Sequence, residues 1–256
     1  MNSCVITPAA GKRLIGKALA AHPAVKQSLQ RGTVVTVAGT TNGYVAEEIL
    51  LALGQAGPFA RNRFFRGLTL PPSVPRTGAG RLSAETDFPG DVVITHGNWQ
   101  QGQTIFDVAD ALTEGDVVIK GANAVDLVRR RAAVLIGDPK GGTIAVAMDA
   151  VVGRRVRLLL PVGVEKRVMT DLDQLASLLN SPGAHGPRLF PVPGEVITEL
   201  DALAMLTGVA AQLVAGGGVD GAEGSVWLAY SGSPEQEASA RDLLSRVAGE
   251  PAFVVS

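Results

Sequence analysis

The chain has 256 residues, of which 46% are hydrophobic and 18% are charged, with 31 glycines and one cysteine. This apolar content excludes intrinsic disorder, and the lone Cys4 excludes a disulfide framework and a cysteine-based zinc site. With a formal net charge of −1, the chain lacks the excess of basic residues that is typical of nucleic-acid-binding proteins, so we expect no nucleic-acid partner.

The N-terminal segment and the apolar runs bear on location. Lys12, Arg13 and Lys17 interrupt the N-terminal segment, which therefore lacks the apolar stretch of a signal peptide. No apolar run approaches the roughly 18 residues that span a bilayer. We expect a cytoplasmic protein with no membrane partner. Self-association into a homo-oligomer is one option for such an aliphatic chain.

Short Val- and Ile-rich runs alternate with segments of helical spacing. In chain order the first half predicts a helix over 7–30, a strand over 33–38, a helix over 44–53, an irregular region over 57–90 with a strand candidate at 63–70, and strands over 91–95 and 116–120. The second half predicts a short helix ending at 131, a strand over 133–136, a helix over 143–153, a strand over 156–161, a helix over 171–179, a strand over 195–199, a helix over 201–215, a strand over 225–230, a helix over 234–248 and a strand over 252–255.

This alternation of strands and helices favours an α/β fold in which a mostly parallel sheet is flanked by helices. The stretch 181–193 is rich in proline and glycine, and it is the best candidate for a domain boundary. We expect a larger domain over 1–185 and a smaller α+β domain over 186–256.

The clearest local signal is the turn Gly39-Thr40-Thr41-Asn42-Gly43, which lies between a predicted strand and a predicted helix. Such a turn exposes backbone N–H groups at a helix N-terminus, where the helix dipole favours an anion. The alternative is ordinary helix capping by Thr41 or Asn42, for which no ligand is needed.

Two further glycine turns have lysines, Lys120-Gly121-Ala122-Asn123 and the segment 138–143 with Lys140, Gly141 and Gly142. Three strand–glycine–helix turns that contain two lysines can converge on one phosphorylated ligand, because lysine is a compact phosphate-binding charge. The alternative is that α/β proteins need glycine at such turns in any case.

The other motif-like features of the sequence are weaker evidence for a functional site. The segment 216–221 fits G-x-G-x-x-G by letter, but it follows a predicted helix and precedes a strand, which is the reverse of a dinucleotide fingerprint. His22, His96 and His185 are isolated, and only His96 follows a strand end. No P-loop, H-E-x-x-H pair or G-x-S-x-G elbow is present, so we expect no cofactor and no metal.

Taken in order, these segments resemble the superfamily of ribose-5-phosphate isomerase type A, glucosamine-6-phosphate deaminase and the CoA transferases. The segment 38–42 stands where the isomerases have G-T/S-G-S-T, and 120–124, followed by Asp126, stands where they have D-G-A-D-E. The segment 140–143, which leads to Asp149-Ala150, stands where they have K-G-G-G and a Glu-Lys pair. Val164-Glu165-Lys166, followed by 190–196, stands at their final lysine and P-x-P-V-E-V segment.

The resemblance covers roughly residues 30–200, and it implies a Rossmann-like domain with a smaller ferredoxin-like domain. In such isomerases a carboxylate moves a proton between adjacent carbons through an enediolate, while lysine and backbone donors hold the phosphate. Here Lys120 and Asn123 replace both carboxylates of D-G-A-D-E, and Asp149 replaces the longer glutamate base. These replacements argue against the isomerase reaction in this chain. They do not affect the expectation of a ligand pocket at the same turns.

The sequence therefore predicts a pocket for a small phosphorylated or carboxylated metabolite, with proton transfer next to a carbonyl if the protein is an enzyme. The catalytic candidates are Asp149 and Lys140, and the ligand-binding candidates are Gly39, Thr40, Thr41, Asn42, Lys120, Gly121, Asn123, Gly141, Gly142 and Lys166. Two alternatives stay open. One is a sensor or scaffold that lost its active site, and the other is an acyl or CoA transferase with Glu165 or Glu195 as nucleophile.

Overall fold

The computed structural model describes residues 1–66, 69, 73 and 88–254. Its strands in this part of the chain are β1 (Asn2–Ile6), β2 (Thr33–Thr36), β3 (Val92–Thr95), β4 (Asn98–Trp99), β5 (Val117–Ile119), β6 (Ala124–Asp126), β7 (Arg131–Ile136), β8 (Arg157–Pro161), β9 (Arg188–Val192), β10 (Glu195–Ile197), β11 (Ala210–Gly216) and β12 (Val226–Ser231). The α-helices are α1 (Pro8–Ala21), α2 (Pro23–Arg31), α3 (Thr40–Ala52), α4 (Ile105–Val108), α5 (Gly142–Arg154), α6 (Leu172–Leu179), α7 (Glu199–Thr207) and α8 (Pro234–Ala248), and the 3₁₀ turns are η1 (Arg61–Arg63), η2 (Ala109–Ala111) and η3 (Val164–Lys166).

The central sheet has the strand order β10-β8-β5-β2-β3-β4. Strands β10, β8, β5 and β2 pair in parallel, and β3 and β4 continue the sheet in antiparallel pairing. The chain is thus a mixed α/β protein, as predicted, with a sheet that is parallel over four adjacent strands and antiparallel at one edge.

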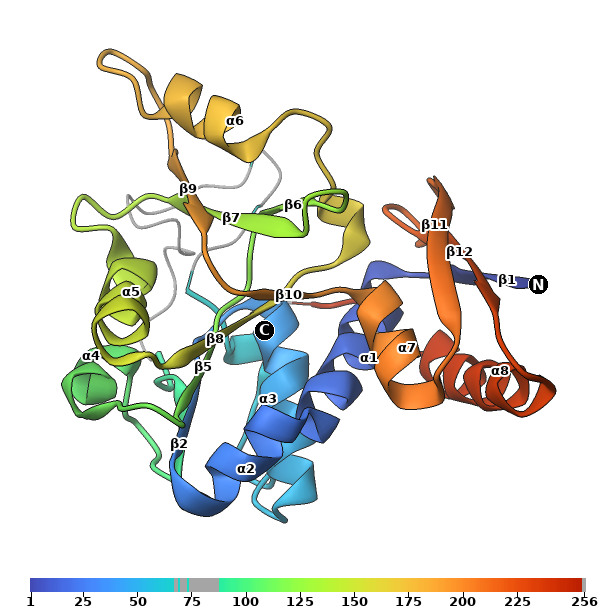
Figure 1. The fold of residues 1–256 in the computed structure, drawn as a ribbon, viewed down its shortest axis with the longest axis horizontal. Helices are drawn as coiled ribbons and strands as arrows, with labels where there is room; N and C mark the ends of the chain where they lie inside the picture. Colours follow the sequence, from blue (N-terminus) through green and yellow to red (C-terminus); the bar gives the residue numbers. More distant parts are fainter. Residues whose placement is uncertain (67–68, 70–72, 74–87, 255–256) are drawn as a thin grey trace.

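Helices cover both faces of this sheet (Figure 1). In β2, Val34 belongs to a core shared with α1 and α3, whereas its neighbour Val35 belongs to a second core shared with α4 and α5. Successive side chains of a strand point to opposite faces. A strand that is covered on both faces is therefore apolar at consecutive positions, which is why the Val- and Ile-rich runs predicted these strands.

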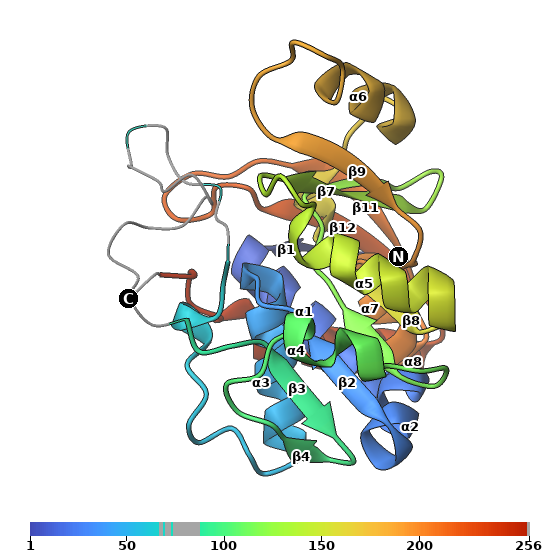
Figure 2. The ribbon, with the colours of Figure 1, turned by 90° about the vertical axis from the view of Figure 1, so that its left-hand side faces the viewer.

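Two smaller antiparallel sheets flank the central one. The sheet β6-β7-β9 packs beneath α6, and the sheet β1-β12-β11 packs against α7 and α8 (Figures 1 and 2). Strand β9 pairs with β7 and β10 pairs with β8, so strands from both sides of residue 185 share sheets. Among the described residues, no helix is long and apolar enough to cross a membrane.

The short helix that was predicted to end at residue 131 is wrong, because this segment is the β6–β7 hairpin. The Oδ1 atom of Asp126 accepts hydrogen bonds from the N–H groups of Val128 and Arg129, both at 2.9 Å. Arg130 then turns the chain with a φ of 55°. A carboxylate that bonds its own backbone two and three residues ahead stabilises a turn in place of a helix.

The helix predicted over 201–215 is correct only in its first part. Gly208 ends α7 in the left-handed region with a φ of 78°, and the chain continues as β11. The helix predicted over 7–30 is two helices, with a break at His22. Residues 64–66 and 252–254 are not strand, and 67–68, 70 and 255 of the same predicted strands lie outside the described residues.

Candidate ligand-binding site

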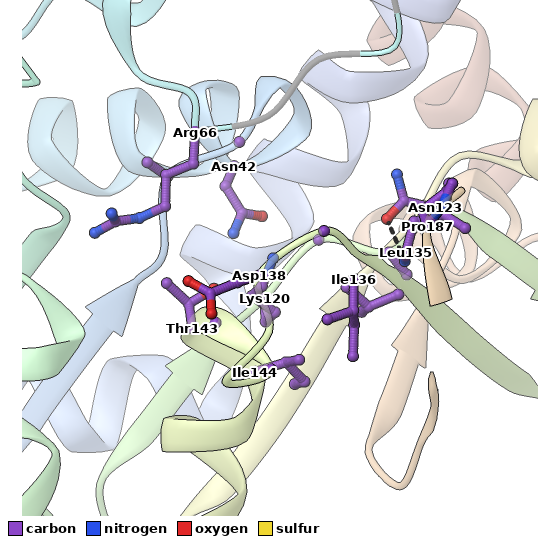
Figure 3. A pocket seen from close by; sticks show the side chains of 18 of the residues that line it. Asn42, Arg66, Lys120, Asn123, Leu135, Ile136, Asp138, Thr143, Ile144 and Pro187 are labelled. Carbon is purple, nitrogen blue, oxygen red and sulfur yellow. Dashed lines mark hydrogen bonds between the residues drawn. The ribbon is translucent and has the colours of Figure 1, made fainter. Parts of the chain in front are cut away.

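A cavity of about 940 Å³ lies where β2, β5 and β8 end, next to the turn that follows β7 (Figure 3). Its described lining residues are Ala38, Gly39, Thr40, Thr41, Asn42, Arg66, Thr69, Phe106, Lys120, Gly121, Ala122, Asn123, Val134, Leu135, Ile136, Gly137, Asp138, Pro139, Gly141, Gly142, Thr143, Ile144, Lys166, Gly186 and Pro187. Ligands of open α/β sheets bind at the carboxyl ends of the strands, and the cavity occupies that edge.

The N-terminus of α3 forms one side of the cavity. Helix α3 starts at Thr40, earlier than predicted, so the glycine–threonine turn is its first turn. Gly39 precedes it in an extended conformation, and no side chain caps the helix. The first N–H groups of a helix have no acceptor within it, so those of Thr40, Thr41 and Asn42 are available to a ligand.

The N-terminus of α5 forms a second side. Gly141 precedes this helix in the left-handed region with a φ of 82°, which suits glycine, and again no side chain caps the helix. Arg188 holds the preceding turn by donating to the carbonyl oxygens of Gly137 at 2.8 Å and Asp138 at 3.1 Å. Two helix N-termini therefore line one cavity without side-chain caps.

Asn42 fixes the start of α3 against the sheet. Its Nδ2 donates to the carbonyl oxygens of Val37 at 2.6 Å and Ile119 at 3.0 Å, so it joins the ends of β2 and β5. Its Oδ1 and the Oγ1 of Thr41 are buried and have no hydrogen-bond partner in the described part of the chain. Buried polar atoms usually have a partner, so these two atoms are exceptions within the wall, as are Thr36 Oγ1 and Tyr44 Oη near it in the sequence.

Among the described lining residues three are cations: Arg66, Lys120 and Lys166. The Nζ of Lys166 donates to the carbonyl oxygen of Ala122 at 3.1 Å. The side chain of Lys120 is half-buried, and burial lowers its pKa to about 8, with Arg66 and Lys166 acting in the same direction. Asp138 is the one carboxylate among the described lining residues, so the wall has a positive balance.

Arg66 is held by the buried carboxylate of Asp91, with Nη2–Oδ2 at 2.9 Å and Nε–Oδ1 at 3.3 Å. Asp91 also accepts from the N–H groups of Ala38 at 2.9 Å and Ile105 at 2.8 Å. The guanidinium of Arg66 lies over the ring of Phe106, 5.6 Å from its centroid. Asp91 thus connects the end of β2, the start of α4 and one cation of the cavity.

The structure brings ten of the predicted site residues to this cavity, namely Gly39, Thr40, Thr41, Asn42, Lys120, Gly121, Asn123, Gly141, Gly142 and Lys166. Asn123 has a structural role as well, since its Oδ1 accepts from the N–H of Leu135 at 3.0 Å (Figure 3). The backbone N–H of Asn123 donates to the carbonyl oxygen of Ala133, which ties it to β7.

The two catalytic candidates lie elsewhere. Asp149 is exposed on α5, and neither it nor the exposed Lys140 lines the cavity. The reason is the helical spacing, because Ile144, Ala147 and Ala150 form the buried stripe of α5 and Asp149 projects away from it. The carboxylate of α5 is thereby placed outside the cavity.

Sequence reasoning missed the apolar part of the wall. Leu135 and Ile136 come from the end of β7, Ile144 from α5 and Pro187 from the segment before β9 (Figure 3). Arg66 comes from the irregular region, where no periodicity signals its position. The wall thus combines polar helix ends with an apolar face, as is usual for small-molecule sites.

The remaining motif candidates lie outside the cavity. His96 is exposed, and its N–H donates to the carbonyl oxygen of Gly32, before β2 begins and away from the strand ends at the cavity. Glu165 and Glu195 are not among the described residues that line the cavity. The segment 216–221 begins at the last residue of β11 and continues into the connection to its partner β12, so it is no dinucleotide fingerprint.

Neither a metal site nor a known relative identifies the ligand of this cavity. Among the described residues, no group of three or more His, Cys, Asp and Glu side chains forms a metal site. Comparisons of the chain with protein-family models, with curated proteins and with solved structures found no match.

Proposed function

We propose that this chain binds a small phosphorylated or carboxylated metabolite in the cavity, with its anionic group at the N-termini of α3 and α5. The observation that carries the proposal is the convergence of two helix N-termini without side-chain caps on one cavity that is also lined by Lys120 and Lys166. Helix N-termini bind anions through backbone N–H groups and the helix dipole, and lysine adds a full charge.

The cavity wall also has an apolar part, which supports a ligand with a carbon skeleton. The apolar side chains of Leu135, Ile136 and Ile144 suit the carbon skeleton.

The proposal includes a kinship with the sugar-phosphate isomerase and CoA transferase superfamily, with a Rossmann-like larger domain and a ferredoxin-like smaller one. The order of the glycine turns along the chain supports this kinship. A non-catalytic sensor or scaffold is the second candidate, and the exposed position of Asp149 outside the cavity favours it over the family's carboxylate mechanism.

Thermal shift with inorganic phosphate, sugar phosphates and CoA esters tests the site. A ligand at 100 times its Kd contributes about 2.7 kcal/mol to the stability of the folded state. Gly39→Leu should abolish the shift, because the added side chain occupies the cavity at the N-terminus of α3. It should leave the Tm of the free protein unchanged, because a Cβ at Gly39 meets no atom within 4 Å and the φ of Gly39 is accessible to any residue.

Gly57→Leu is the matched control, since Gly57 also has open space around its Cβ position and does not line the cavity. It should keep the full ligand shift. If no anion stabilises the wild-type chain, or if Gly39→Leu retains the shift, the site is not where we place it.

A further inference from the structure

Lys120 differs from the other two cations of the cavity wall. Its backbone N–H donates to the carbonyl oxygen of Leu159 at 2.9 Å, which fixes the residue where β5 ends beside β8. Its side chain lines the cavity, but its Nζ makes no hydrogen bond or ion pair with any described residue. By contrast, Lys166 donates to Ala122 and Arg66 is paired with Asp91.

The surroundings of Lys120 favour its neutral amine. Desolvation lowers its pKa to about 8, and the cations Arg66 and Lys166 oppose a further positive charge. Asp91 acts in the opposite direction, but its oxygens already accept from Arg66 and from two backbone N–H groups. About a tenth of such an amine is neutral at pH 7, and the neutral amine is the nucleophile.

We propose that Lys120 forms an imine with an aldehyde or keto group of the anionic ligand. This inference rests on the proposed function, because the helix N-termini and Lys166 must hold the anionic group while the carbonyl carbon reaches the Nζ of Lys120. Such a substrate is an oxo compound with a phosphate or carboxylate group.

The step balances without any oxidant or reductant. The lone pair of the neutral Nζ attacks the carbonyl carbon, and a C–N bond forms. Both protons of the amine pass to the former carbonyl oxygen, the C–O bond breaks, and water leaves. A proton from solvent converts the imine to its cation, which withdraws electrons from the adjacent carbon and acidifies its C–H bond. Proton transfer next to a carbonyl then follows without the carboxylate mechanism of the isomerases.

Reductive trapping with pyridoxal 5′-phosphate tests this role, because the probe has both an aldehyde and a phosphate. The full chain is incubated with an equimolar amount of probe, reduced with borohydride and mapped by peptide mass. We expect the secondary amine at Lys120 at least ten times more often than at the exposed Lys140. Excess inorganic phosphate should suppress labelling at Lys120 and leave labelling at Lys140 unchanged.

Lys120→Arg keeps the charge, so it should lose the adduct at this position and still be stabilised by inorganic phosphate. Lys140→Arg is the matched control, and it should label at Lys120 as the wild type does. Equal labelling of Lys120 and Lys140 in a chain that phosphate stabilises overturns the imine and leaves the anion site intact. Selective labelling of Lys120 without any stabilisation by phosphate shows a reactive amine but overturns the anion site, and with it the imine to an oxo anion that we propose.

Discussion

The buried carboxylate of Asp91 connects three parts of the site, and Asp91→Asn tests how strongly it does so. The carboxylate is fully shielded from solvent and accepts four hydrogen bonds, from Ala38, Ile105 and twice from Arg66. An asparagine of the same shape keeps one acceptor oxygen. Its NH₂ group replaces the other oxygen and faces N–H donors that it cannot accept from. It also leaves the guanidinium of Arg66, whose side chain is 19% exposed, without its counterion.

Removal of one partner from a buried ion pair costs about 3–5 kcal/mol, because the remaining charge stays desolvated. For a chain of this size, each kcal/mol lowers the Tm by about 2–4 °C, so we expect Asp91→Asn to lower it by roughly 6–20 °C. Calorimetry and urea unfolding measure the change. The control is Glu114→Gln, because Glu114 and Arg155 form an ion pair at 3.8 Å with side chains 74% and 83% exposed. Such an exposed pair should leave the Tm unchanged within error.

The Arg66→Met background separates the charge from the hydrogen bonds. There Asp91→Asn no longer leaves an unpaired guanidinium, so its cost should fall below the cost in the wild type. The reasoning is refuted if Asp91→Asn lowers the Tm no more than Glu114→Gln does, or if its cost is the same with and without Arg66.

Two further predictions concern buried titratable groups, each measured by urea unfolding across a pH series. The pKa of Lys120 is lowered in the folded chain, so the wild type should gain stability as the pH rises from about 8 toward 10.5, whereas Lys120→Met should be more stable at pH 7 and lack this gain. Lys140→Met should leave the pH profile of the wild type unchanged, and a destabilising Lys120→Met would contradict the prediction. Burial and the nearby Glu165 raise the pKa of Glu199 to about 7. The wild type should therefore lose stability between about pH 4.5 and 7, because the unfolded chain gives up the proton in this range while the folded chain keeps it, and Glu199→Gln should remove this loss. Lys12 faces the same carboxyl and opposes the shift, and an unchanged pH slope in Glu199→Gln would show that another group titrates.

The sequence predicted the parallel strands well, because each is covered on both faces and is therefore apolar at consecutive positions. It predicted β6 and β11 poorly. The turn after β6 depends on Asp126 accepting hydrogen bonds from its own backbone, and in β11 only Ala211 and Leu213 are partly buried. Strand β1 was missed because its partner β12 lies more than 200 residues away in the sequence and its alternating burial gives no apolar run.

The same contrast applies to the candidate site. Its glycines and lysines were predicted because they follow strands that end at one edge of a parallel sheet, so the fold itself brings them together. Arg66 and Phe106 reach the cavity from irregular segments, and Asp91 is recognised only through its hydrogen bonds to Ala38 and Ile105. Asp149 was predicted by resemblance alone. It lies on the exposed face of α5, opposite the buried stripe of that helix.

Lys120 is where stability and function are expected to oppose each other. A half-buried amine without a partner among the described residues lowers the stability of the fold, and methionine at this position fills similar space without that penalty. If Lys120 served packing alone, the wild type would show no selective adduct at Lys120, and Lys120→Met would change stability and leave the binding of an oxo anion unchanged. If it serves the ligand, Lys120→Met gains stability and loses trapping, whereas Lys120→Arg keeps the anion and loses only the imine. The two variants therefore separate a packing residue, an anion contact and a nucleophile.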